Sequence, residues 1–395
     1  MITLTVIFWL SLFIIFYSYA GYGMLVSFIL FIKRIFSKKK QHTELKAFEP
    51  AITLIVAAYN EEAFINAKIT NTLLLDYPRD KLSVIFVTDG SNDKTPAIVS
   101  QYESIRLYHQ PGRRGKVAAI NRVMQFVITP VVVFSDANTL LNRECLKEIA
   151  KHYQDPKVGG VAGEKKILEL TNSSAAGAGE GIYWKYESIL KKLDSDLNTV
   201  VGAAGELFSI RTELFEETNE DVLLDDFVIS LKICIRGYLI KYEPKAYAME
   251  APSALMKEEQ KRKIRISAGG FQSLVMLKEL FNIIKYPLLS FQFISHRVLR
   301  WTLCPICLFA LLIINVILVV NGESILYNLF LLMQILFYLM ASLGWLYANN
   351  NIKIKLLYIP YYFLFMNVSL IIGFTRYVKN QQSVLWEKAT RQTVS

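Results

Sequence analysis

Long apolar segments lie at both ends of the chain, and shorter ones occupy its middle. The first, residues 2–32, carries no charge and exceeds the roughly 20 residues that a helix needs to cross a bilayer. Other apolar segments of helical length occupy residues 302–320, 325–346 and 356–374. From Pro50 to Pro252 the apolar runs shorten to strand length, with charged residues between them. The pattern predicts a soluble domain of about 200 residues flanked by membrane helices.

Basic residues follow the first apolar segment and predict its orientation. They are Lys33, Arg34, Lys38, Lys39 and Lys40. Because such clusters stay on the cytoplasmic side, residues 1–34 are expected to form a transmembrane helix with the N-terminus outside. A cleaved signal peptide is the alternative, but the apolar run is long and no basic residues precede it.

Short apolar runs in the central domain have the length and β-branched composition of buried strands. They occupy residues 52–58, 82–88, 106–109 and 131–134. Helical spacing follows at 63–75, from about Thr95, and through Asn121. Since strand and helix alternate with short connections, we expect an α/β domain with a parallel sheet and right-handed crossovers.

Polar residues follow three of these strands. They are Tyr59-Asn60-Glu61-Glu62, Asp89-Gly90-Ser91-Asn92-Asp93 and Ser135-Asp136-Ala137-Asn138. The carboxyl ends of parallel strands meet at one edge of a sheet, where α/β proteins bind their ligands. Carboxylate and amide oxygens there suit a divalent cation on a diphosphate. An isolated D-x-N is also typical of an Asx turn, so the repetition of polar strand ends is the stronger signal.

Composition and charge narrow the class. The chain is 53% hydrophobic, too apolar for an ordinary soluble enzyme, and its net charge is +10. Much of the basic excess adjoins apolar segments, which favours anionic lipid and phosphorylated substrates over nucleic acid. The four cysteines have neither zinc-site spacing nor a disulfide framework, which fits a reducing cytoplasm.

Five motifs in order resemble the GT-A glycosyltransferases of family 2, of the cellulose, hyaluronan and poly-N-acetylglucosamine synthase type. They are A-Y-N-E-E at 58–62, V-T-D-G-S-N-D at 87–93, F-S-D-A-N-T at 134–139, G-A-A-G-E-L-F-S-I-R at 202–211 and L-D-D-F at 224–227. The resemblance implies a Rossmann-like, mostly parallel GT-A domain over residues 50–252 that uses a UDP-sugar donor.

The resemblance also implies a donor site. Glu61 and Asp89 would hold the uridine, with Tyr59 against the base. Asp136 and Asn138 occupy the D-x-D position, which carries Mg²⁺ or Mn²⁺ on the diphosphate. The amide at Asn138 replaces the second carboxylate, and one fewer charge weakens binding of a free cation. We therefore expect the metal to arrive largely with the nucleotide.

Two basic residues are candidates for contact with the diphosphate. Lys116 follows Gly115 and would meet phosphate oxygens as a point charge; a solvated loop lysine is the alternative. The family motif Q-x-x-R-W aligns with residues 262–266, where Arg262 and Ile266 replace the glutamine and the tryptophan. Only its arginine remains, as Arg265, which would neutralise the leaving diphosphate. The R-V-L-R-W run at 297–301 is a rival placement of the motif.

Two adjacent acids are the catalytic candidates. Asp225 and Asp226 would lie in the first turn of a helix, where the helix dipole alone also favours carboxylates. The family pattern makes Asp226 the base that deprotonates the acceptor hydroxyl, with inversion to a β-linked product. For the acceptor site, the resemblance points to Gly205, Glu206 and Trp184. Core packing is the alternative for the tryptophan.

The remaining segments are expected at the membrane. Residues 253–300 would form amphipathic interfacial helices, because the basic run at 257–266 is typical of a solvated or lipid-surface face. Residues 301–376 would span the membrane or re-enter it. Positive charges follow the segment 356–374, so a re-entrant or interfacial course is preferred there. The tail, residues 377–395, would return to the cytoplasmic face near the active site.

Together these patterns predict an inverting, metal-dependent glycosyltransferase in the cell membrane. It would be multi-pass, with a cytoplasmic catalytic domain, and would extend a cell-surface glycan. Because three or four helices make a thin wall for a polymer passage, single addition to a polyprenyl-phosphate-linked sugar is the alternative. An inactive nucleotide-binding membrane scaffold is a third reading. Expected partners are membrane lipids, a glycan or lipid-linked acceptor, and an accessory export subunit or a homo-oligomer.

Overall fold

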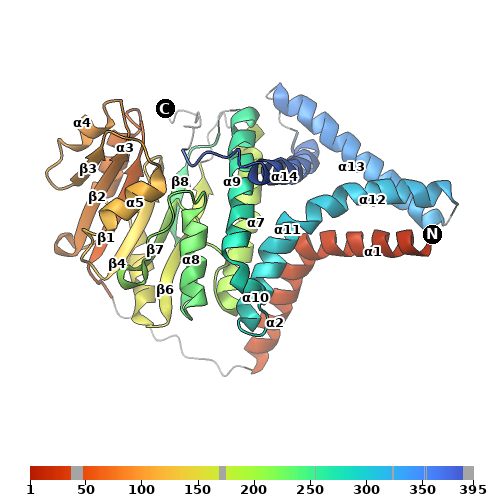
Figure 1. Cartoon of the computed structure of the whole chain (residues 1–395), viewed down its shortest axis with the longest axis horizontal. Helices are drawn as coiled ribbons and strands as arrows, with labels where there is room; N and C mark the ends of the chain where they lie inside the picture. The colour runs from red at the N-terminus through yellow and green to blue at the C-terminus, as the bar shows by residue number, and fades with distance from the viewer. Residues whose placement is uncertain are drawn as a thin grey trace.

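An eight-stranded sheet forms the centre of residues 50–252. The structure is a computed structural model, and it describes residues 1–36, 48–168, 175–253, 255–322, 324–350, 352 and 354–385. The strands are β1 (Ile52–Ala58), β2 (Leu82–Asp89), β3 (Arg106–Gln110), β4 (Val131–Asp136), β5 (Thr139–Leu141), β6 (Val158–Ile167), β7 (Leu207–Arg211) and β8 (Leu239–Glu250). Their order is β3-β2-β1-β4-β7-β6-β8-β5 (Figure 1). Strands β1 to β4 are parallel, as are β6 and β8, while β7 and β5 are antiparallel to their neighbours. The mostly parallel, Rossmann-like sheet expected from the sequence is confirmed.

The register of the sheet brings the polar strand ends to one edge. Ala57 of β1 lies opposite Val87 on one side and Asp136 on the other. Every residue of β1 is buried, because helices cover both faces and an apolar run is stable only there. The ring of Phe134 stacks on that of Phe208 in β7, with centroids 4.8 Å apart. The site edge therefore rests on a rigid core.

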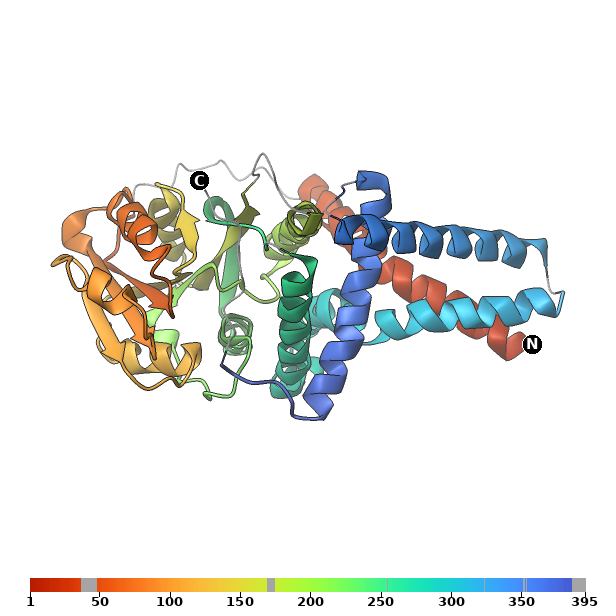
Figure 2. The same cartoon turned by 90° about the horizontal axis from the view of Figure 1, so that it is seen from above.

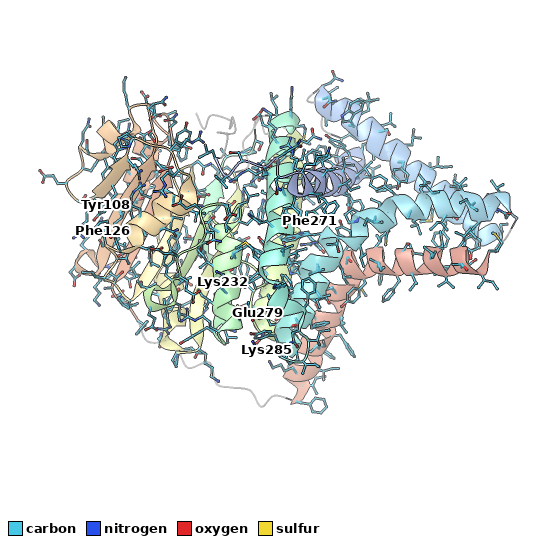
Figure 3. All side chains as sticks on the ribbon, viewed as in Figure 1. Tyr108, Phe126, Lys232, Phe271, Glu279 and Lys285 are labelled. Carbon is cyan, nitrogen blue, oxygen red and sulfur yellow. The ribbon has the colours of Figure 1, made fainter. Side chains whose placement is uncertain are left out.

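Short helices cover the sheet. Those expected from the sequence are α3 (Ile65–Leu73), α4 (Thr95–Val99), α5 (Lys116–Met124) and α8 (Asp225–Ile235). One more, α6 (Cys145–Ala150), was not expected. At the edge of the sheet, the rings of Tyr108 and Phe126 stack with centroids 4.6 Å apart and close one end of the core (Figure 3).

Two long helices, α7 (Ala175–Leu197) and α9 (Met256–Met276), stand between the sheet and the apolar helices (Figure 1). The sequence predicted a basic face on α9 turned to solvent or lipid. That expectation is wrong for Arg262 and Lys263, which are largely buried in ion pairs with Glu259. Further along α9, Phe271 packs against Phe374, with ring centroids 5.0 Å apart (Figure 3).

The N-terminal helix bends. It consists of α1 (Ile2–Phe16), a π-helical turn (Tyr17–Gly21) and α2 (Tyr22–Phe36), and Figure 1 shows α1 and α2 running in different directions. Tyr22, Val26 and Leu30 of α2 form a cluster with Leu190 and Leu197 of α7. The second half of the predicted transmembrane helix thus packs on the central domain. Of its basic cluster, Lys38, Lys39 and Lys40 lie outside the described residues.

Four helices among the described residues are long and apolar enough to span a membrane. They are Ile2–Phe36, Leu303–Val320 (α12), Ile325–Asn349 (α13) and Leu356–Val378, the last within α14 (Lys355–Val378). In both Figure 1 and Figure 2, α1, α12 and α13 extend together away from the sheet, and α14 crosses their direction.

A short connection leads from α9 to the apolar bundle. It contains α10 (Pro287–Phe293), a π-helical turn (Ile294–Val298) and α11 (Leu299–Trp301). At the other end, the chain after α14 returns to the central domain, since a Cβ on Gly115 would lie 3.8 Å from the carbonyl oxygen of Val384. The rest of the predicted C-terminal segment, from Trp386 on, lies outside the described residues.

Candidate active site

A cavity of about 550 Å³ lies between the carboxyl edge of the sheet and helices α7, α9 and α14. Its sheet side carries most of the residues that the sequence selected for chemistry. They are Lys116, Asp136, Gly205, Glu206, Asp225 and Asp226, and Trp184 lines the wall formed by α7. Residues far apart along the chain therefore meet around one hollow.

Lys116 and Asp136 form an ion pair in this cavity. Lys116 begins α5, Asp136 ends β4, and their Nζ and Oδ1 atoms are 2.6 Å apart. Burial works against the charged form of Lys116, but the charges of Asp136 and Asp225 outweigh it and raise the pKa of the lysine. Burial also raises the pKa of Asp136, which Lys116 opposes. The alternative of a solvated loop lysine is wrong.

Asp226 is an acid in a buried setting beside a second carboxylate. It lies in the first turn of α8, and its Oδ1 accepts a hydrogen bond of 2.8 Å from the N–H of Phe227. Burial, followed by the negative charge of Asp225, raises the pKa of Asp226 to about 7, and Lys116 opposes this rise. A pKa near the working pH is what proton abstraction requires.

The loop before β7 approaches these two groups closely. A Cβ on Gly205 would lie 3.2 Å from Lys116 Nζ and 3.3 Å from Asp226 Oδ2. The glycine therefore leaves space for a small group between the lysine and the carboxylate.

Asp89 holds the loop that leads into α5. Its Oδ2 accepts hydrogen bonds from the backbone N–H groups of Arg114, at 2.8 Å, and Gly115, at 2.6 Å. Nearby, the guanidinium of Arg113 lies 3.8 Å from the ring centroid of Tyr59. A small second pocket is lined by residues of this region and by Lys116, which also lines the main cavity. The donor-side residues thus adjoin the cavity, and Arg113 is an addition that the sequence motifs did not indicate.

Three of the selected residues line neither of these two pockets. The backbone N–H of Glu61 donates to Thr95 Oγ1 at 2.9 Å, and the side-chain amide of Asn138 donates to Glu250 Oε1 at 3.3 Å. Arg265 is half-buried, and its buried Nε has no hydrogen-bond partner among the described residues. Burial lowers its pKa, and the charges of Asp225, Asp136 and Asp226 oppose that change.

A buried network of ion pairs includes Glu206 and fixes its position. Lys165, with a side chain 0% exposed, lies 2.5 Å from Glu206, 3.5 Å from Glu180 and in close contact with Glu250. Burial opposes ionisation of Glu206, but Lys165 lowers its pKa to about 2. Glu206 is thus held as a carboxylate, and its network reaches Asn138 through Glu250.

The segment before α12 also reaches the cavity. Arg297, Arg300 and Trp301 line it, and the ring of Trp301 lies 5.4 Å from that of Phe227, next to Asp226. The rival placement of the R-x-x-R-W motif therefore contributes to the site, and so does Ile266 of the other placement. The sequence feature that could have identified this segment is a pair of arginines and a tryptophan directly before an apolar helix.

Sequence patterns did not indicate the apolar wall on the membrane side. Its members come from the π-helical turn after α1 and from α14. They are Tyr19, Tyr358, Tyr362, Phe363 and Met366.

The central domain matches a known family. Residues 53–218 fit the model described as Glycosyl transferase family 2. Together with the sheet topology, this match defines the class: the chain carries a family 2 glycosyltransferase domain of GT-A fold, between helices long and apolar enough to span a membrane.

Its relatives are synthases of a bacterial polysaccharide. The chain is 27% identical to the poly-β-1,6-N-acetyl-D-glucosamine synthase of Staphylococcus aureus (strain COL) over 265 residues, which is 63% of this chain and 62% of that one. The synthase of Staphylococcus epidermidis is 24% identical over 297 residues, 71% of this chain and 69% of that one. Similarity to the first synthase thus spans less than two thirds of its length.

The fold has a solved counterpart. A mannosyltransferase of Pyrobaculum calidifontis, solved with GDP-Man and Mn²⁺, superposes with a TM-score of 0.70 at 22% identity, covering 95% of this chain and 100% of that chain. At this identity the likeness establishes the fold.

Proposed function

We propose that the protein is an inverting membrane glycosyltransferase that moves a sugar from a UDP-sugar to an acceptor hydroxyl. The observation that carries this proposal is the meeting of Lys116, Asp136 and Asp226 in one cavity that continues to the apolar helices. An acceptor at the membrane surface and a donor from the opposite side would meet there. The family match supports the class of reaction.

Asp226 is the proposed base. It would take the proton of the acceptor hydroxyl as that oxygen attacks the anomeric carbon and the bond to the diphosphate breaks. A single base opposite the leaving group gives direct displacement, so an α-linked donor yields a β-linked product. Positioned general-base catalysis contributes about 10²- to 10⁴-fold to the rate. Asp225, the first acid of the pair, keeps the pKa of Asp226 high.

On the donor side, Asp89 and the loop before α5 would hold the uridine, with Tyr59 against the base. Lys116 would turn from Asp136 to the phosphate oxygens, and the positive charge of Arg265 would stabilise the departing diphosphate. Glu61 would make a further contact with the uridine.

The chain fits a divalent cation that arrives with the donor. Among the described residues no three His, Cys, Asp or Glu side chains gather to hold a metal, and the Asn138 amide is directed to Glu250. Asp136 would therefore hold Mg²⁺ or Mn²⁺ with little help from the protein, the remaining ligands coming from the diphosphate. A bound cation there would neutralise charge that develops on the leaving group.

The acceptor would occupy the cavity beside Gly205, Glu206 and Trp184. By analogy with the synthases that it resembles, the protein would extend a cell-surface glycan in the cell membrane, with its catalytic domain in the cytoplasm. An accessory export subunit or a second copy would then help to form the passage.

The test uses membranes that contain the protein, a panel of radiolabelled UDP-sugars with UDP-N-acetylglucosamine first, and sizing of the products. Asp226→Asn should lower transfer by about 10²-fold or more while donor binding is kept. Asp196→Asn, an exposed acid on α7, is the control and should transfer normally. Normal turnover in Asp226→Asn would remove that residue from the mechanism. Absence of turnover with every donor in the wild type would contradict the proposed function.

A further inference from the structure

Three cations converge on the part of the cavity wall that adjoins the apolar bundle. Arg297 and Arg300 come from the segment just before α12, and Lys191 comes from α7; all are almost completely buried. Glu187 pairs with both arginines, at 2.9 Å from Arg297 and 2.6 Å from Arg300. In the described part of the chain, Lys191 has no carboxylate within ion-pair distance. The two buried arginines thus share one carboxylate.

Buried charge of this kind is costly unless an anion balances it. This cost is reflected in the pKa of Lys191, which burial lowers and the nearby charge of Arg297 lowers further. A structural ion pair would be complete with one arginine and one carboxylate. The second arginine and Lys191, which has no ion-pair partner among the described residues, therefore favour a ligand that brings negative charge.

Hydrogen-bond donors are in excess at the same wall. Within the described residues, Nη1 of Arg300 and Nε1 of Trp184 are buried and have no acceptor. Unmatched buried donors cost about 1–3 kcal/mol each, so their presence favours an acceptor-rich ligand. Phosphate oxygens accept hydrogen bonds, and arginine binds them in a fork geometry. A neutral sugar would add hydroxyl donors of its own.

The cluster lies between the proposed base and the membrane side. The guanidinium of Arg297 is 5.9 Å from the ring of Phe227, the residue after Asp226. On the other side, Tyr362, Phe363 and Met366 of α14 form an apolar wall of the same cavity. A ligand with a sugar toward Asp226, a phosphate at the arginines and an alkyl chain along α14 would match this sequence of surfaces.

We infer that Lys191, Arg297 and Arg300 bind the phosphate of a lipid-linked acceptor, a membrane lipid whose phosphate carries the sugar to be extended. This inference rests on the proposed function and narrows its acceptor to one substrate class. The phosphate is a binding group and takes no part in the bond that forms.

Binding can be measured without catalysis. The purified full chain in detergent is titrated with citronellyl phosphate, citronellol or inorganic phosphate, and the fluorescence of its tryptophans, two of which line the cavity, is followed. Citronellyl phosphate should bind at least about tenfold more tightly than either other compound. Equal binding of citronellol would mean an apolar cavity only, and equal binding of inorganic phosphate a free-anion site; either result overturns the inference.

Two variants test the residues. Arg300→Gln should reduce the preference for citronellyl phosphate over citronellol by about tenfold or more. Lys191→Gln, which breaks no ion pair, should act in the same direction if the first variant fails to fold. Arg236→Gln removes an arginine paired with Glu216 away from the cavity and should leave the preference unchanged. An equal loss for both compounds in both cavity variants would indicate a structural role and contradict the inference.

Transfer assays separate this inference from the proposed function. The wild type should use a sugar linked to citronellyl phosphate at a lower KM than the same sugar on a decyl glycoside. A preference for the decyl glycoside, with normal donor turnover, would overturn the inference and leave the proposed function standing. Tight binding of citronellyl phosphate without turnover of any donor would count against the proposed function alone.

Discussion

Lys116 Nζ lies 2.6 Å from Asp136 Oδ1, so the start of α5 is held against the carboxyl end of β4. Only 14% of the lysine side chain and 19% of the aspartate side chain are exposed. Burial lowers the pKa of this lysine, but the charges of Asp136, Asp225 and Asp226 outweigh burial and raise it. One positive charge therefore links the proposed metal-binding carboxylate to the proposed catalytic pair.

Replacement of this lysine should weaken donor binding. In the proposed mechanism Lys116 meets the phosphates, and a hydrogen bond to a charged group is worth about 1.5–3 kcal/mol. Lys116→Met should therefore raise the donor KM by about tenfold or more. A donor titration at fixed acceptor concentration measures this, with Lys192→Met, an exposed lysine on α7, as the control. An unchanged donor KM in a folded Lys116→Met protein would exclude this role.

The rate of transfer should depend on pH through Asp226. Since the base must be ionised and its pKa is about 7, kcat/KM should rise about tenfold per pH unit below 7 and level off above. The charge of Asp225 disfavours ionisation of Asp226, so Asp225→Asn should shift the rising limb to lower pH. Rates from about pH 5.5 to about 8.5 check both statements. A flat profile in the wild type would rule out Asp226 as the titrating base.

Two glycines of one loop should respond differently to alanine. A Cβ on Gly205 would meet only the movable ends of Lys116 and Asp226, at 3.2 and 3.3 Å. Stability should change by less than about 0.5 kcal/mol. Turnover should nevertheless fall by about tenfold or more, because small displacements of reacting groups are costly. Full activity in Gly205→Ala would show that nothing reacts between these two side chains.

Gly202→Ala should instead unfold the loop. The φ of Gly202 is +89°, and a Cβ there would lie 2.1 Å from the ring of Phe227. Backbone strain and overpacking each cost about 1–3 kcal/mol. The thermal unfolding midpoint should fall clearly, whereas that of Gly205→Ala should stay near the wild-type value. Equal midpoints in the two variants would contradict the packing described here.

The sheet and its polar edge could be predicted because their signals are local. An apolar run such as β4 must be buried on both faces, and the register then fixes where Asp136 emerges. The position of Asp226 in the first turn of α8 followed from a carboxylate pair placed directly before a helical pattern. For these residues, neighbours in sequence determine the environment.

The membrane-side wall of the cavity could not be predicted, because tertiary contacts create it. Tyr19 and Tyr362 come from opposite ends of the chain, and each looks like an ordinary aromatic residue of an apolar helix. The basic residues of α9 were wrongly expected to face solvent or lipid for a related reason. Charge pattern alone does not distinguish a solvated lysine from one that Glu259 neutralises inside the fold, as at Lys263.

The ion-pair network around Glu206 allows buried charge neutralisation to be tested by comparing two neighbouring lysines. Lys165 is 0% exposed and compensates Glu206, Glu180 and Glu250, while the side chain of Lys166 is 43% exposed and lies 3.9 Å from Glu164. Removal of one partner from a buried cluster costs about 3–5 kcal/mol, and loss of an exposed pair costs at most about 1 kcal/mol.

Lys165→Met should therefore lower the thermal unfolding midpoint strongly, and Lys166→Met should barely change it. The pKa of Glu206, about 2 beside Lys165, should rise toward its ordinary value once the cation is gone. Protonation would then relieve part of the charge imbalance, so the Lys165→Met protein should recover stability as the pH is lowered from neutral. Unfolding midpoints of both variants across this pH range provide the measurement. Equal midpoints in the two variants at neutral pH would mean that solvent reaches the network and that Glu206 is not held from behind.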